Sequence, residues 1–167
     1  MIILIVMIYS ETIKLKGPED TEALGRLIAD AAQPGEVYAL VGDLGTGKTT
    51  LVQAVARGLG IKSKILSPTF TIVQEYDEGR LPLYHFDVYR VSSEDDLFEL
   101  GFDEYLEGRG ICLIEWADLI EELLPEDICA IFLDYGASEE ERYCRIVSPL
   151  GLRPVETGLS GPAFEEK

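Results

Sequence analysis

Apolar side chains recur every three or four positions in several stretches of this chain, which is the spacing of one helix face. In the first stretch, Leu24, Leu27 and Ile28 follow helix-start chemistry at Pro18–Thr21, and Pro34-Gly35 ends the pattern. The same reasoning predicts helices over residues 21–31, 49–59, 94–100 and 117–124.

Short apolar runs lie between these helices, and such runs are typical of buried strands. A turn at Asp77-Glu78-Gly79 joins two of them, which predicts an antiparallel pair in an otherwise parallel sheet. Strands are predicted over residues 1–8, 37–41, 70–76, 83–89, 111–114, 128–133 and 142–147. The alternation predicts an α/β fold, a three-layer sandwich around a mixed, mainly parallel central sheet that binds ligands at the carboxyl ends of its strands.

The length of 167 residues fits one domain, which we assign to residues 1–148. Residues 149–167 are rich in glycine and proline and have no periodicity, so we expect a flexible tail. The apolar opening Met1–Ile8 is too short to cross a membrane and lacks the basic region of a signal peptide. We therefore expect no membrane attachment, and Met7 is an alternative first residue of the protein.

Acidic residues dominate the charge of the chain, with 31 acids against 14 bases and a formal net charge of −17. Nucleic-acid affinity comes largely from Lys and Arg, so we expect any contact with nucleic acid to run through a protein partner. The alternative is that the acid excess only keeps the protein soluble. Cys112, Cys129 and Cys144 have no paired spacing and are predicted to be buried free thiols of a cytoplasmic protein.

Residues 42–49 carry the most specific local signal, because they match G-x-x-x-x-G-K-[ST] at every fixed position. In this pattern the glycines let backbone N–H groups turn inward around phosphates, Lys48 places a positive charge on the β and γ oxygens, and the Thr49 hydroxyl ligates Mg²⁺. A strand is predicted before the loop and a helix after it, whose N-terminus also attracts phosphate. The segment therefore indicates a P-loop in an NTPase-like fold, and the alternative is a Gly-rich turn without a ligand. The predicted nucleotide contacts are Gly42, Asp43, Leu44, Gly45, Thr46, Gly47, Lys48, Thr49, Thr50 and Trp116.

Two acids end predicted apolar strands, namely Asp87 and Glu115. Mg²⁺ at a P-loop usually needs a second acid at the end of a neighbouring strand. Both carboxylates are therefore predicted to lie near the metal and the attacking water, and the sequence leaves open which of them positions the water. The alternative for either is a solvated acid at a strand end.

Four further positions carry less specific signals. Ser67–Thr71 lies where switch-type NTPases have a phosphate-sensing loop, and Thr69 is predicted to complete the Mg²⁺ shell, unless the segment is only a Ser-Pro turn. His85, the only histidine, is expected to be a hydrogen-bonded core residue. Arg90 is expected to steady phosphates or Asp87, or to form a surface ion pair, and Trp116 to pack in the core or to touch nucleotide or a partner.

The nature of the base is indicated by what the sequence lacks. Guanine-specific P-loop proteins usually carry N-K-x-D, and this chain contains no asparagine. It also lacks the D-x-x-G switch. ATP is therefore favoured over GTP as the nucleotide.

Four blocks of sequence occur together in a specific order. They read GDLGTGKTT at 42–50, SPTFT at 67–71, HFDVYR at 85–90 and IEW at 114–116. The set resembles the TsaE (YjeE) family, the bacterial ATPase of tRNA threonylcarbamoyladenosine formation, over residues 9–147. Thr46 departs from the alanine usual in the family, at a variable loop position.

The resemblance implies a cytoplasmic, Mg²⁺-dependent ATPase that is slow alone. Such proteins are needed to form threonylcarbamoyladenosine at position 37 of tRNA, and they act with the TsaB–TsaD pair, which carries the transferase chemistry. It implies that Lys48 and Thr49 hold phosphates and Mg²⁺, that Thr69 is the switch threonine, and that Asp87 and Glu115 are the acids near metal and water. tRNA would be contacted only through the partners.

Two other functions remain open from the sequence. A small-molecule kinase fits the size, although the only arginines between Arg57 and Arg142 are the scattered Arg80, Arg90 and Arg109. A non-hydrolysing module in which ATP only orders Ser67–Thr71 fits the absence of an evident arginine finger, as does a partner that supplies such a group.

Overall fold

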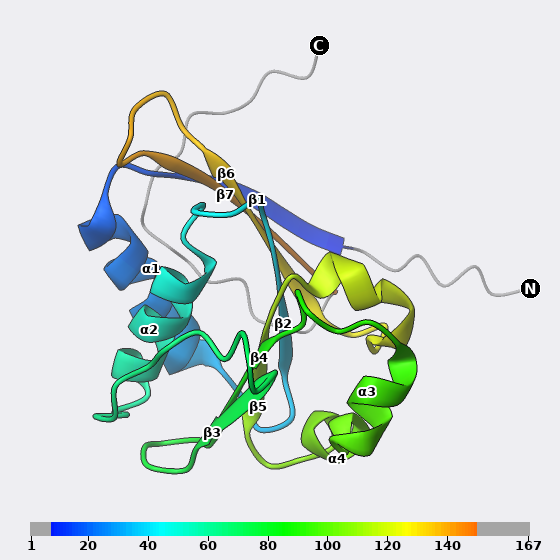
Figure 1. Cartoon of the computed structure of the whole chain (residues 1–167). Helices are drawn as coiled ribbons and strands as arrows, with labels where there is room; N and C mark the ends of the chain where they lie inside the picture. Colours follow the sequence, from blue (N-terminus) through cyan, green and yellow to red (C-terminus); the bar gives the residue numbers. More distant parts are fainter. Residues whose placement is uncertain (1–7, 150–167) are drawn as a thin grey trace, which may run out of the picture.

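A seven-stranded mixed sheet forms the centre of the computed structural model, which describes residues 8–149 (Figure 1). The strands lie in the order β1-β7-β6-β2-β5-β4-β3. Their bounds are Ile8–Leu15 for β1, Val37–Val41 for β2, Val73–Tyr76 for β3, Leu83–Asp87 for β4, Ile111–Glu115 for β5, Cys129–Tyr135 for β6 and Arg142–Pro149 for β7. The helices are α1 at Pro18–Ala31, α2 at Lys48–Gly58, α3 at Glu94–Glu99, α4 at Phe102–Leu106 and the 3₁₀ helix η1 at Ala117–Leu123.

The parallel part of the sheet is its centre, where β6, β2, β5 and β4 run side by side. The pairs β1–β7, β6–β7 and β3–β4 are antiparallel. The predicted mixed sheet is confirmed, but "mainly parallel" describes only this centre. The carboxyl ends of the four parallel strands meet at one edge, and the segments that follow β2, β4 and β5 are those singled out from the sequence.

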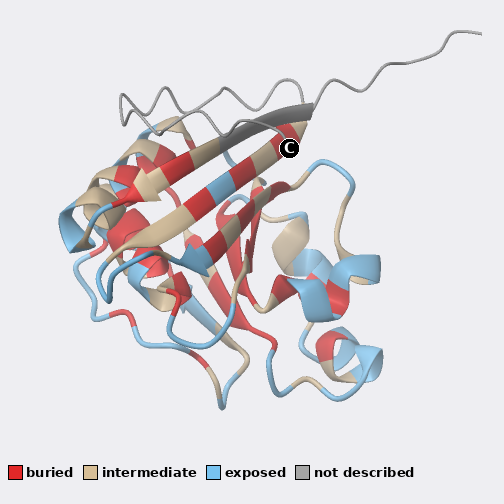
Figure 2. Cartoon of the chain, turned by 90° about the horizontal axis from the view of Figure 1, so that it is seen from above, coloured by how far each residue is buried: buried red, intermediate tan, exposed pale blue. Residues whose placement is uncertain are grey.

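Helices cover both faces of the sheet, which confirms the three-layer α/β fold (Figure 1). On one face α1 and α2 pack together, with Leu24, Leu51 and Val55 fully buried against the strands. On the other face a second core forms around Phe86 and Ile114, beneath α3, α4 and η1. Figure 2 shows the central strands almost wholly buried, while the helices keep one exposed side.

Several predicted elements differ from the observed ones. The strand predicted over 70–76 begins only at Val73, because 69–72 forms a turn in which Ile72 has a φ of 66°. The helix predicted over 117–124 is a 3₁₀ helix with non-helical torsions at Ile120. Helix α4 was not predicted, and it follows the left-handed Gly101 (φ 72°).

The chain ends fall largely outside the described residues. Strand β1 at Ile8–Leu15 follows the apolar run for which a strand was predicted, and residues 1–7 of that run are not described. The tail predicted from residue 149 lies outside them as well, except for Pro149, the last residue of β7. Within residues 8–149, no helix has the length and apolar character needed to cross a membrane.

The cysteine prediction is confirmed for two of the three residues. Cys112 and Cys129 are buried free thiols, and burial raises the pKa of each to about 12. Cys144 is buried as well. Thiols with such raised pKa values are poor nucleophiles near neutral pH, so none of the site chemistry below involves Cys112 or Cys129.

Candidate nucleotide-binding site

The loop between β2 and α2 has the backbone that its glycines require. Gly45 and Gly47 have φ values of 79° and 101°, in the left-handed region that disfavours side chains. A Cβ at Gly42 would lie 2.4 Å from the Leu133 carbonyl oxygen. Helix α2 begins at Lys48, so the open N–H groups of its first turn point toward the loop, as an anion site requires.

Lys48 is almost buried beneath this loop, with 5% of its surface exposed. Its Nζ donates hydrogen bonds to the carbonyl oxygens of Gly42 (2.5 Å) and Asp43 (2.9 Å). Burial lowers the pKa of Lys48, and the charges of Glu115 and Asp87 act in the opposite direction. The ammonium group of Lys48 therefore binds neutral backbone carbonyl oxygens. A phosphate carries full negative charge and can attract the ammonium group away from them.

Trp116 closes the other side of Lys48. The ring centroid lies 4.0 Å from Nζ, within cation–π distance. Tyr89 packs against the same indole, with 4.7 Å between ring centroids. Trp116 has a φ of 60°, which is uncommon for a residue with a side chain and is often found at functional sites.

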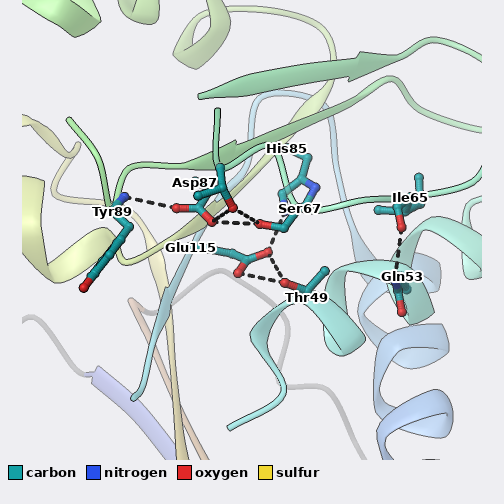
Figure 3. Close-up of polar contacts among 9 residues, drawn as sticks. Thr49, Gln53, Ile65, Ser67, His85, Asp87, Tyr89 and Glu115 are labelled. Atoms are coloured by element: carbon teal, nitrogen blue, oxygen red, sulfur yellow. Dashed lines mark hydrogen bonds and ion pairs between the residues drawn. The ribbon is translucent and has the colours of Figure 1, made fainter. Parts of the chain in front are cut away.

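The two predicted acids are neighbours across the sheet. Asp87 pairs with Glu115 in the register of β4 and β5, and both carboxylates are buried. The Thr49 hydroxyl donates to both oxygens of Glu115, at 2.8 and 3.0 Å (Figure 3). The structure therefore brings together the helix start after the P-loop and the ends of two parallel strands.

Asp87 binds the loop of residues 67–71 rather than the P-loop. Its Oδ2 accepts hydrogen bonds from Ser67 Oγ (2.8 Å) and Thr69 Oγ1 (3.3 Å), and its Oδ1 accepts one from the Tyr89 N–H (3.1 Å) (Figure 3). Thr69 therefore lies beside one predicted metal-binding acid and Thr49 beside the other.

The tip of the same loop is exposed. Phe70 has 83% of its surface accessible, although the Arg90 guanidinium lies 4.5 Å from its ring centroid. Gln53 of α2 donates to the Ile65 carbonyl oxygen (3.0 Å) and so ties the segment before the loop to the P-loop helix.

A cleft of about 480 Å³ lies between these segments. It is lined by Leu44, Gly45, Gly47, Lys48, Thr49, Thr50, Ser67, Thr69, Asp87, Tyr89, Arg90, Glu115 and Trp116. Of the predicted nucleotide contacts, Gly42, Asp43 and Thr46 do not line it. Thr46 is buried and its hydroxyl donates to the Asp43 carbonyl oxygen (2.8 Å), so its side chain shapes the loop.

The lining suits a triphosphate with Mg²⁺. Hydroxyl and carboxylate oxygens are hard ligands of the kind that Mg²⁺ prefers. Among residues 8–149 no group of three or more His, Cys, Asp or Glu side chains could hold a metal by itself. Mg²⁺ usually takes one or two protein ligands and completes its shell with phosphate oxygens and water, so Thr49 with a nearby carboxylate fits a site shared with a nucleotide.

Two residues that the sequence analysis did not identify form hydrogen bonds with backbone carbonyl oxygens of the P-loop. The Tyr135 hydroxyl donates to the Leu44 carbonyl oxygen, and Arg142 Nη2 donates to that of Gly45 (3.2 Å). Tyr135 ends β6 and Arg142 begins β7, so the two residues pair with each other next to the turn of the β6–β7 hairpin. Nothing local in the sequence marks them, because the contacts span more than ninety residues.

The three-layer fold and the glycine loop between β2 and α2 define an α/β protein with a P-loop NTPase-like fold. A protein-family model described as "Threonylcarbamoyl adenosine biosynthesis protein TsaE" matches residues 15–144. The chain therefore belongs to the TsaE family, as its resemblance in four sequence blocks predicted.

Similar proteins agree with this membership. The chain is 52% identical over 123 residues to the tRNA threonylcarbamoyladenosine biosynthesis protein TsaE of Bacillus subtilis, covering 74% of this chain and 77% of that one. It is 42% identical over 118 residues to the TsaE of Treponema pallidum, covering 71% and 87%. The crystal structure of Bacillus subtilis YdiB matches with a TM-score of 0.74 and 43% identity, over 85% of this chain and 87% of that one.

Proposed function

We propose that this protein is a Mg²⁺-dependent ATPase that acts with the TsaB–TsaD transferase pair in forming threonylcarbamoyladenosine at position 37 of tRNA. Membership of a family named for this biosynthesis supports the pathway. The observation that carries the activity is the convergence of Lys48, Thr49, Asp87 and Glu115 on one cleft.

Each of these residues has a chemical role in the proposed hydrolysis. Lys48 leaves its two carbonyl partners and neutralises charge on the β and γ phosphates. Glu115 or Asp87 orients the attacking water. Bound Mg²⁺ would supply further neutralisation of phosphate charge, with the Thr49 hydroxyl and these carboxylates as its protein ligands. ATP, rather than GTP, is proposed because the chain has no asparagine and so no N-K-x-D motif.

The surface around the cleft supports dependence on a protein partner. Leu44 and Phe70, which are 81% and 83% exposed, come from the P-loop and the neighbouring loop, and Leu66 is 59% exposed. Exposed apolar side chains beside the cleft offer contact area to a protein partner. The net charge of −17 favours a protein rather than tRNA as the direct partner.

The ATPase proposal is tested by measuring phosphate release from ATP by the purified chain. We expect Lys48→Ala and Thr49→Ala to abolish release, because one removes the phosphate-binding charge and the other the metal-binding hydroxyl. Lys64→Ala removes an exposed lysine outside the cleft and serves as the control, with unchanged activity expected. Full activity in either P-loop variant would contradict the proposal.

The alternative functions have less support from the cleft. A small-molecule kinase usually needs several arginines around its phosphates, and Arg90 is the only arginine among the lining residues. ATP-dependent phosphorylation of a sugar or nucleoside would nevertheless establish it. A non-hydrolysing module agrees with the contact between Asp87 and the 67–71 loop, and nucleotide binding without phosphate release, even with all partners, would favour it.

A further inference from the structure

His85 is a buried polar residue to which the proposed hydrolysis assigns no role. It lies in β4 two residues before Asp87, and its side chain is fully buried. Its Nε2 is 2.7 Å from Oε1 of Glu115 (Figure 3). At this distance His85 forms a hydrogen bond with a carboxylate of the site, not with a group of the surrounding core.

The two nitrogens of the ring have different surroundings. Nε2 faces Glu115, whereas Nδ1 is buried and has no hydrogen-bond partner within the described residues. An orphaned buried N–H group is rarer in proteins than an under-satisfied acceptor. The neutral tautomer with its hydrogen on Nε2 fits both nitrogens, because Nε2 then donates to Glu115 and Nδ1 carries no hydrogen.

The Glu115 carboxylate is held from two sides. Thr49 approaches from α2 and donates to both oxygens, and His85 approaches from β4 and contacts Oε1 alone. If the Thr49 oxygen turns to a metal ion, as P-loop chemistry requires, its contact with Glu115 must weaken. His85 of β4 then remains as the hydrogen-bonding partner of the Glu115 carboxylate, and its Nε2 cannot enter the metal shell without leaving that carboxylate.

We propose that His85 is a positioning residue, whose Nε2–H holds Oε1 of Glu115 and thereby fixes the orientation of this carboxylate toward Thr49 and the metal–nucleotide site. This inference rests on the proposed function. Partners that orient carboxylate and histidine ligands in this way typically change metal affinity or activity by about 10–100-fold when they are lost.

The test compares His85→Gln with His85→Asn. The glutamine amide nitrogen reaches the position of Nε2, whereas the shorter asparagine amide reaches only that of Nδ1, so the two variants are equally polar but differ in the donor. We expect His85→Gln to stay within a few-fold of the wild type. His85→Asn should raise the Mg²⁺ concentration for half-maximal ATP binding about 10–100-fold and lower kcat, while affinity for ATP without Mg²⁺ stays within about twofold.

Ile111→Val is the matched control for a loss of stability. Ile111 is fully buried in β5, the strand that ends at Glu115, and its side chain is apolar and forms no hydrogen bond with the site. Thermal unfolding is measured for every variant. If His85→Asn does not fold, His85→Leu takes its place, with the same expected shift.

Three results overturn the inference. His85→Asn with wild-type Mg²⁺ dependence does so, as does an equal shift in His85→Gln and His85→Asn, because the donor position would then not matter. A shift of the same size in Ile111→Val would assign the effect to stability. Failure of the proposed function gives a result distinct from these three, because the wild type would then bind ATP with Mg²⁺ but release no phosphate. The Mg²⁺ dependence of ATP binding would still test the role of His85 in that case.

Discussion

The two buried carboxylates of the site have different hydrogen-bond partners. Glu115 accepts hydrogen bonds from Thr49 and lies against His85, whereas Asp87 binds Ser67 and Thr69. The two acids therefore bind different segments. Glu115 binds Thr49 of helix α2, and Asp87 binds the loop of residues 67–71. This division gives the two carboxylates separable roles.

Glu115→Gln should reduce the rate of hydrolysis more than Asp87→Asn does. The amide keeps the shape but removes the charge near the metal and water, so we expect kcat to fall on the order of 10²–10⁴-fold. Single-turnover phosphate release at saturating ATP measures this loss. Glu122→Gln, an exposed glutamate on η1, is the control, and a kcat for Glu115→Gln within threefold of it would refute the assigned role.

The Trp116 ring is expected to support nucleotide affinity through Lys48. Trp116→Ala removes the ring 4.0 Å from Nζ, and a cation–π contact contributes about 0.5–2 kcal/mol. We therefore expect ATP to bind about 2–30-fold more weakly. Trp116→Phe retains an aromatic face and should recover most of the affinity in a fluorescent-nucleotide titration. Equal loss in both variants would mean that the indole acts in another way.

Elements far apart in the sequence fix the shape of the P-loop. The hairpin of β6 and β7 contributes Tyr135 and Arg142, which bind the carbonyl oxygens of Leu44 and Gly45. A rigid loop keeps its N–H groups inward before the nucleotide arrives, which reduces the entropy lost on binding. The hairpin therefore belongs to the functional site although it does not line the cleft.

Tyr135→Phe should weaken ATP binding moderately. It removes one hydrogen bond to the loop, a loss of about 0.5–1.5 kcal/mol, which corresponds to about 2–10-fold in Kd. Isothermal titration measures the change. Tyr105→Phe removes a comparable hydroxyl contact, to Glu75 and away from the P-loop, and should leave the Kd unchanged. A Tyr135→Phe variant that binds ATP as tightly as the wild type would exclude a role for this contact.

Local patterns in the sequence predicted the longer elements well. Helices α1 and α2 and strands β2 and β5 agree with their predicted ranges to within a few residues, because each carries a clear apolar periodicity or run. Helix α4 and the 3₁₀ helix η1, both on the second face, were harder to predict. Helix α4 has only five residues, and η1 changes its torsions at Ile120, so neither has a full helical repeat.

Sequence also identified the segments of the site but not their contacts. The positions of Asp87 and Glu115 at strand ends predicted their shared edge, whereas the register that pairs them depends on how β4 and β5 align. His85 was predicted to be a hydrogen-bonded core residue, and that agrees with its burial. Its partner Glu115 lies thirty residues away, so only the fold could reveal it.

At the scale of the whole molecule, the negative charge of this protein disfavours direct binding of tRNA, which is also negatively charged. With a net charge of −17, the chain should not bind tRNA by itself. We expect fluorescence anisotropy at 0.15 M salt to give a Kd weaker than the roughly 10⁻⁶–10⁻⁴ M of non-specific binders. Tight binding by the isolated chain would contradict the proposal that tRNA is reached through protein partners.

We propose that this chain is an ATPase whose turnover serves the transferase pair. The most direct test measures ATP hydrolysis and modified tRNA together, for the chain alone and then with TsaB–TsaD and tRNA. We predict slow hydrolysis alone, strong stimulation by the partners and ATP-dependent multiple turnover of modified tRNA. Partners that neither bind nor stimulate the chain, with no gain in modified tRNA, would contradict the claim.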